Sequence, residues 1–96
     1  MRRIKLTVAY DGTYYCGWQI QPNGITIEEV LNQQLSRLTG EEIHVIGASR
    51  TDSGVHALGN IAVFDTNSTI PPGRFACAVN QKLPEDIVVI HSEEVP

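Results

Sequence analysis

A short polar segment in the middle of the chain carries side chains that could perform chemistry. Arg50-Thr51-Asp52-Ser53-Gly54-Val55-His56 brings a cation, a hydroxyl, a carboxylate and an imidazole together, between the apolar runs Ile43–Ile46 and Ile61–Phe64. A polar cluster between two expected strands is typical of a functional loop on a rigid scaffold. Asp, Ser and Gly are also common turn residues, so a turn without further function is the alternative interpretation.

The carboxylate of Asp52 is the candidate catalytic group of this segment. Arg50 is a near neighbour in sequence, and a close cation favours the charged form of a carboxyl group. Asp52 should therefore stay ionised near neutral pH, which suits a nucleophile or a general base and not a proton donor. Gly54 allows the backbone to approach a ligand closely or to adopt a positive φ.

The segments around this loop predict strands and helices that would hold it. Residues 3–10 alternate apolar and polar side chains, which indicates a half-buried strand. Thr26-Ile27-Glu28-Glu29 has the form of a capping box, and an apolar stripe at helical spacing follows it as far as a stop at Gly40. Further strands are expected at 43–46, 59–66 and 87–90, and a second helix is expected from the prolines at 71 and 72 to Pro84.

The predicted order of elements is β-α-β-β-α-β. This is the ferredoxin-like order, which gives an α+β domain with a four-stranded antiparallel sheet and both helices on one face. Ile87-Val88-Val89-Ile90 is apolar on both faces, so this strand is expected to be covered on both sides. The tail Ser92–Pro96 has no closing element, as expected where a longer chain is cut at a domain boundary.

Composition indicates one small globular domain. The chain has 96 residues and a formal net charge of −4, which argues against a stand-alone nucleic-acid binder without excluding one. Cys16, Cys77 and the three histidines show no metal-ligand spacing. No apolar run is long enough to span a bilayer, and the start of the chain does not resemble a signal peptide. A reduced, cytoplasmic protein is expected.

Motifs spread along the whole chain resemble those of one known family. They are Tyr10-Asp11-Gly12-Thr13, Gly17-Trp18-Gln19, Arg50-Thr51-Asp52-Ser53-Gly54-Val55-His56-Ala57, Phe64-Asp65-Thr66, and Asn80 with Leu83-Pro84. In this order they are similar to the TruA-type tRNA pseudouridine synthases, and the arginine–threonine–aspartate block is the specific part. Cys16 and Ser49 depart from the family, which commonly has histidine and glycine there. The family's enzymes are more than twice as long and carry two such domains, so residues 1–96 are expected to be the N-terminal domain.

The resemblance implies isomerisation of uridine to pseudouridine in the tRNA anticodon stem-loop, without a cofactor. The target base would be unstacked and flipped, as in other enzymes that act on bases. Asp52 would be the catalytic carboxylate, either as a nucleophile or as the base that removes a ribose proton. The implied partners are tRNA, a C-terminal domain that is absent from these residues, and a second copy in a homodimer.

Other residues of the motifs are candidates for binding and support. Gln19, Arg50 and His56 are the candidate substrate-binding residues, although Arg50 could instead pair only with Asp52 and His56 could be structural. Trp18 could stack on RNA, but a packing role is the favoured interpretation. Structural support of the site is expected from Thr51, Gly54, Trp18 and Asn80.

Two other functions fit parts of the sequence. Asp52-Ser53-Gly54 matches the short signature of aspartic proteases, including the dimeric retroviral type, but Arg50 would oppose the shared proton of such a pair and the predicted helices do not fit. The predicted order also occurs in RNA-recognition domains, which stack bases on exposed rings of the central strands. Phe64 is the only ring on the corresponding strands here, and fold order alone does not decide function.

Overall fold

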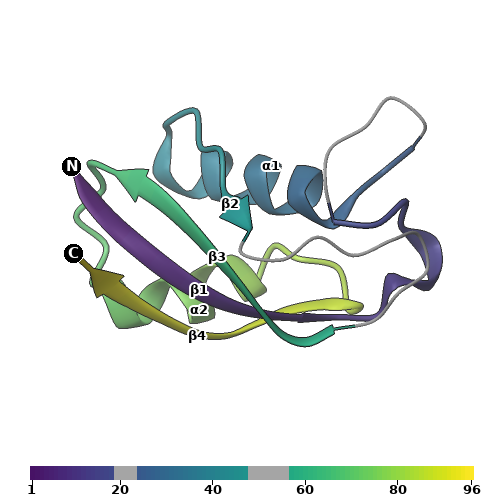
Figure 1. The fold of residues 1–96 in the computed structure, drawn as a ribbon. Coiled ribbons are helices and arrows are strands. Elements are labelled where there is room, and N and C mark those ends of the chain that lie inside the picture. The colour runs from purple at the N-terminus through teal and green to yellow at the C-terminus, as the bar shows by residue number, and fades with distance from the viewer. Residues whose placement is uncertain (19–23, 48–56) are drawn as a thin grey trace.

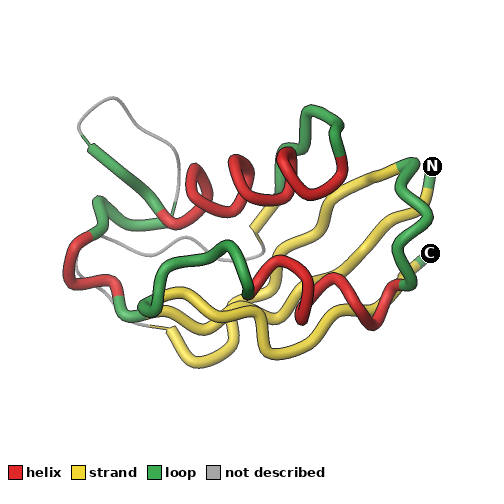
Figure 2. The backbone as a smooth tube through the Cα atoms, turned by 180° about the vertical axis from the view of Figure 1, so that it is seen from behind, coloured by secondary structure: helices red, strands yellow, loops and turns green. Residues whose placement is uncertain are grey.

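The structure is a computed structural model that describes residues 1–18, 24–47 and 57–96. Within these residues the strands form one antiparallel sheet in the order β2-β3-β1-β4, and both helices lie on the same face of it (Figures 1 and 2). This confirms the predicted ferredoxin-like arrangement. The elements are β1 (Arg2–Tyr10), the 3-10 turn η1 (Gly12–Tyr14), α1 (Ile27–Thr39), β2 (Ile46–Gly47), β3 (Ala57–Thr66), the 3-10 turn η2 (Pro72–Arg74), α2 (Phe75–Asn80) and β4 (Ile87–Val95).

The core lies between the sheet and the two helices. Alternate residues of β1 face the helices and are fully buried, as the period of a strand predicts. Phe64 of β3 meets Phe75 of α2 edge to face, with ring centroids 5.4 Å apart. Each such buried side chain contributes about 1.5–3 kcal/mol relative to an exposed one, which fixes both helices on this face. The fully or almost fully buried apolar side chains include Ile4, Leu6, Val8, Ile27, Leu31, Leu35, Phe64, Phe75 and Val79.

The predicted cap at Thr26 and the predicted stop at Gly40 are confirmed at the two ends of α1. The Thr26 hydroxyl accepts a hydrogen bond from the Glu29 amide at 3.3 Å, and Gly40 closes the helix with a φ of 73°. The first two helical amides, those of Ile27 and Glu28, donate to the carbonyls of Gly17 and Trp18 at 3.1 and 3.0 Å. Because these backbone carbonyls satisfy the amides that a helix start leaves open, α1 offers no free amide cradle there for a phosphate.

The prediction of a strand at 43–46 is mostly wrong, because β2 contains only Ile46 and Gly47. The backbone amides before it bond to side chains of α1 instead of to a neighbouring strand. Ser36 Oγ accepts from the Ile43 amide at 2.9 Å, and Asn32 Oδ1 accepts from the Val45 amide at 2.8 Å. Ile43 and Val45 are therefore buried against the helix without forming a ladder.

The second helix also differs from its prediction, because α2 ends at Asn80 and not at Pro84. The Asn80 side chain is bonded to β4, and the chain turns at once, with the amides of Lys82 and Leu83 donating to the Val79 carbonyl at 2.9 and 3.1 Å. At the other end, Ser92 Oγ of β4 accepts from the Ala76 amide and donates to the Pro72 carbonyl. Side-chain hydrogen bonds thus fasten both ends of α2 to the edge strand.

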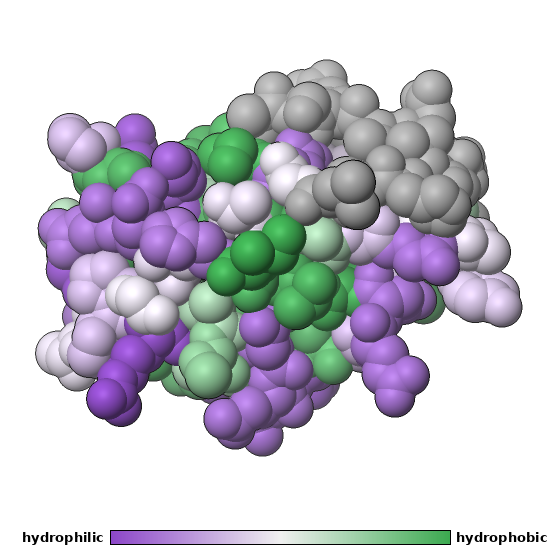
Figure 3. Space-filling model, turned by 90° about the horizontal axis from the view of Figure 1, so that it is seen from below, coloured by the Kyte–Doolittle hydropathy of each residue, from purple (hydrophilic) through white to green (hydrophobic). Residues whose placement is uncertain are grey.

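β4 runs to Val95, beyond the predicted end at Ile90, and its outer face is uncovered in the described part of the chain. Val88 and Ile90 are 43% and 57% exposed, so the expected cover on both sides is not provided by these residues. Figure 3 shows an apolar area in the middle of this open face, bordered by hydrophilic residues. No helix among the described residues is long and apolar enough to cross a membrane.

Candidate active site

The predicted catalytic and binding residues fall in two segments that lie outside the described residues. Segment 48–56 contains Arg50, Thr51, Asp52, Gly54 and His56, and segment 19–23 contains Gln19. Of the predicted support residues, Trp18 and Asn80 are described. The residues that flank the two segments are described, so the scaffold of the candidate site is defined by Trp18, Gly24, Gly47 and Ala57.

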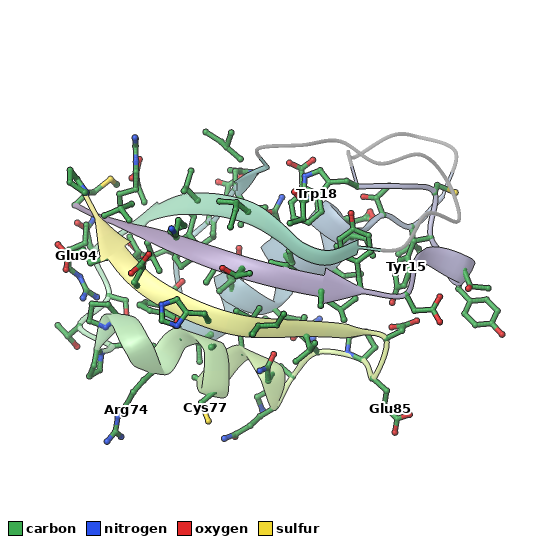
Figure 4. All side chains as sticks on the ribbon, turned by 60° about the horizontal axis from the view of Figure 1, so that its bottom comes forward. Tyr15, Trp18, Arg74, Cys77, Glu85 and Glu94 are labelled. Carbon is green, nitrogen blue, oxygen red and sulfur yellow. The ribbon has the colours of Figure 1, made fainter. Side chains whose placement is uncertain are left out.

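Trp18, labelled in Figure 4, directly precedes segment 19–23, and Gly47 directly precedes segment 48–56. Its indole is 1% exposed, which agrees with a packing role and not with an open stacking surface. The ring lies against Gly47, the last described residue before segment 48–56, so closely that a Cβ at position 47 would come 2.3 Å from Nε1 and 2.6 Å from Cε2. Glycine is therefore required by this close approach, although Gly47 belongs to none of the motifs in the sequence.

Tyr10 supports the opposite end of segment 48–56. It pairs across the sheet with Ala57, the first described residue after the segment, and its side chain is buried. The rings of Tyr10 and Trp18 contact each other, with centroids 5.9 Å apart at an interplanar angle of 35°. One pair of buried aromatic side chains thus holds the backbone on both sides of the segment that carries Asp52.

The segment that presents Trp18 is fixed by hydrogen bonds. The Tyr15 hydroxyl donates to Asp86 Oδ1 at 2.6 Å, and the Cys16 amide donates to the Ile25 carbonyl at 2.8 Å. Burial, followed by the bond to Asp86, raises the pKa of Tyr15, so its hydroxyl remains a donor. Gly24, the first residue after segment 19–23, lies against Cys16. A Cβ at position 24 would come 2.6 Å from Cys16 Sγ.

Asn80 supports the edge of the sheet. Its Nδ2 donates to the Val89 carbonyl at 2.9 Å, and its Oδ1 accepts from the Val89 amide at 2.8 Å. The side chain replaces the missing neighbour of the edge strand β4 at this position. These bonds do not reach the ends of segment 48–56, so a role in bracing that loop remains a prediction.

The open face of the sheet carries ion pairs and aliphatic side chains in the described residues. Arg3 Nε lies 3.0 Å from Asp65 Oδ1, and Lys5 Nζ lies 2.9 Å from Glu93 Oε1. These cations lower the pKa of Asp65 and of Glu93 through hydrogen bonds, so β1 presents paired charges and not free cations for phosphate.

An RNA-recognition surface is not found on the described part of this face. Phe64, the only ring that the sequence offered on the corresponding strands, is buried and packs on Phe75 of α2. Ile61 and Val63 of β3 take the outward positions instead. The described residues also contain no group of three or more His, Cys, Asp or Glu side chains that would hold a metal ion.

Comparisons with known proteins agree on one family. A family model described as tRNA pseudouridine synthase matches residues 6–96. The chain is 56% identical over 96 residues to "tRNA pseudouridine synthase A" of Ruminiclostridium cellulolyticum and 56% identical over 95 residues to "tRNA pseudouridine synthase A 2" of Clostridium perfringens. It is 49% identical over 96 residues to the Geotalea daltonii protein named as a tRNA pseudouridine synthase A. These matches cover 99–100% of the chain and 39% of each relative, so the chain spans about two fifths of their length.

Proposed function

The chain belongs to the tRNA pseudouridine synthase family, and from this membership we propose that it is the part of such an enzyme that carries the catalytic carboxylate. The observation that carries the proposal is the family match over residues 6–96, with identities of 49–56% to relatives named for this activity. The predicted resemblance to this family is thereby confirmed. A chain of the relatives' length that contains these 96 residues, called the full-length chain below, isomerises uridine to pseudouridine in tRNA.

Asp52 acts as the nucleophile or as the base in this proposal. The neighbouring guanidinium of Arg50 favours its ionised form, which both roles require. The described scaffold supports the assignment, since the aromatic pair Tyr10 and Trp18 holds both ends of segment 48–56. A loop fixed at both ends presents a reacting group at lower entropic cost than a free one. Gln19, Arg50 and His56 contact the RNA, and Thr51 and Gly54 shape the loop around Asp52.

The partners follow from the same proposal. The substrate is a uridine of the tRNA anticodon stem-loop, flipped out of its stack to reach Asp52. No cofactor is needed, because the uracil is detached from its ribose carbon, turned and rejoined through its own carbon. The remaining pocket residues come from a C-terminal domain outside these 96 residues, and the full-length chain works as a homodimer in the cytoplasm.

The experiment uses a tRNA transcript tritiated at uracil C5, which loses the label when C5 becomes the glycosidic carbon. The full-length chain should release tritium, and its Asp52→Asn variant should release none above the blank. Asp65→Asn is a matched control, because Asp65 is an exposed carboxylate paired with Arg3 on the sheet. Retention of activity in Asp52→Asn would remove Asp52 from the mechanism. Absence of release by the unaltered full-length chain, with tRNA still bound, would point to a binding module instead.

A further inference from the structure

We propose that Tyr15 and Asp86 are positioning residues for segment 48–56, acting through Trp18 and Tyr10. The inference rests on the proposed function, because it assigns to this pair the task of placing the loop that carries Asp52. Neither residue belongs to the polar segment that suggested the chemistry, and they lie 71 positions apart in sequence. The described geometry nevertheless connects them, through neighbouring residues of the chain, to Tyr10 and Trp18, which lie next to the two ends of that segment.

Asp86 holds the turn that follows β1 at two points. Its side chain accepts the Tyr15 hydroxyl at 2.6 Å, and its backbone carbonyl accepts the Asp11 amide at 2.9 Å. Tyr15 is 8% exposed and Asp86 is half-buried, so this hydrogen bond to a carboxyl oxygen is partly shielded from water. The turn between Asp11 and Tyr15 is thereby fixed to the residue that precedes β4.

The fixed turn leads directly to the aromatic pair. Tyr10 ends β1, where it pairs with Ala57 on one side and with Ile87 on the other. Beyond Tyr15, the amide of Cys16 bonds to Ile25, and the chain then reaches Trp18, whose ring lies against Gly47. Loss of the Tyr15 hydroxyl would remove one of the two bonds that fix the turn to Asp86, while the bond from the Asp11 amide and the Tyr15 ring stay in place. The expected consequence is a shift of Trp18 against Gly47 and hence of the backbone that enters segment 48–56.

The adjacent tyrosine provides a matched control. Tyr14 is 85% exposed, whereas Tyr15, labelled in Figure 4, is 8% exposed. Tyr14→Phe and Tyr15→Phe remove the same atom from neighbouring positions. At the partner position, Asp86→Asn keeps an oxygen acceptor for the hydroxyl, whereas Asp86→Ala removes it. The four variants therefore separate the hydrogen bond from general effects of substitution.

The test uses the full-length chain at a temperature far below its unfolding transition. The kcat and KM of tritium release from tRNA are measured for each variant, and hydrogen exchange is followed in peptides that cover residues 48–57. Tyr15→Phe and Asp86→Ala should lower kcat about 10- to 100-fold with little change in KM, as for a misplaced reacting group, and should accelerate exchange in these peptides. Tyr14→Phe and Asp86→Asn should have kcat values and exchange rates close to those of the unaltered chain. The double variant Tyr15→Phe/Asp86→Ala should lose no more kcat than either single variant, because both substitutions remove the same bond.

A lower melting temperature of Tyr15→Phe with unchanged kcat and unchanged exchange in residues 48–57 would overturn the proposal, since the bond would then be structural only. A decrease in kcat in Tyr14→Phe as large as that in Tyr15→Phe would overturn the proposal as well. If the unaltered full-length chain releases no tritium, the proposed function fails. The exchange measurement still decides in that case whether Tyr15 and Asp86 position the segment, so the two failures are distinguishable.

Discussion

The indole of Trp18 and the backbone of Gly47 touch, with no room for a side chain at position 47: a methyl group there would come 2.3 Å from Nε1 of the ring. This contact brings together the residue that precedes segment 19–23 and the residue that precedes segment 48–56, although they lie far apart in sequence. A residue that packs in the core thus links the two segments that hold the predicted RNA-contacting and catalytic side chains.

Gly47→Ala should displace Trp18, because the added methyl overlaps three atoms of the ring at 2.3–2.9 Å. Overpacking of this kind costs about 1–3 kcal/mol. Trp18 is the only tryptophan among the 96 residues, so its fluorescence reports on this contact directly and also follows unfolding in urea. Gly73→Ala is the control, since a Cβ at position 73 has no atom within 4 Å. Equal urea midpoints and equal emission spectra for both variants would contradict the close contact.

Asn80→Ala should destabilise the chain by about 1–3 kcal/mol, because it leaves the amide and the carbonyl of Val89 without the bonds that Asn80 provides. The free energy of unfolding is measured by urea titration. Gln81→Ala removes a similar amide group from the next residue, which is exposed, and should change stability little. If Gln81→Ala lowered the free energy of unfolding as much as Asn80→Ala does, the destabilisation would come from a change at the end of the helix and not from loss of the bond to β4.

Local signals determined which parts of the fold could be predicted. α1 was predictable because its caps, Thr26 and Gly40, and its apolar stripe are all contained within the helix and its ends. The prediction of a strand at 43–46 was mostly wrong because Ile43 and Val45 are buried while their amides bond to side chains of α1, those of Ser36 and Asn32. Hydrophobic periodicity does not report which partner the amides choose. The predicted end of the second helix was wrong for a similar reason, since the Asn80 side chain bonds to β4, which comes later in the chain.

The supports of the candidate site depend on contacts between distant positions. Trp18 was predicted to pack, and it does, but its partner Gly47 carried no signal beyond its place just before the polar segment. The bond between Tyr15 and Asp86 spans 71 positions, so local sequence patterns do not report it. The chemistry of Asp52 was suggested by its neighbours in sequence; its supports required the fold.

Glu41 should make stability depend on pH. Its carboxylate accepts hydrogen bonds from the Thr66 hydroxyl and the Asn67 amide, and these bonds lower its pKa in the folded chain. A carboxyl group with a lowered folded pKa contributes stability that is fully present above its ordinary pKa of about 4.3 and is lost as pH falls through the lowered value. The urea concentration at the midpoint of unfolding of the unaltered chain should therefore decrease as the pH is lowered through this range.

Replacement of that carboxylate separates its contribution from general acid unfolding. Glu41→Gln should be less stable than the unaltered chain near neutral pH, and the difference should shrink at pH values below the folded pKa of Glu41, where the unaltered side chain is protonated too. Glu85→Gln removes an exposed carboxylate elsewhere and serves as the control. A constant difference between Glu41→Gln and the unaltered chain at every pH would show that the charge of Glu41 is not the cause.

The 96-residue chain alone should fold but show little or no isomerase activity. Its core is closed by its own helices, so Trp18 fluorescence should report a cooperative unfolding transition in urea. It spans only 39% of the relatives' length, and the resemblance assigns further pocket residues to the remainder. Without them, Asp52 lacks the groups that hold the flipped uridine in reach, and such positioning accounts for much of an enzyme's rate. Tritium release by this chain should match that of its Asp52→Asn variant, whereas turnover at the rate of the full-length chain would show that these residues form a complete site.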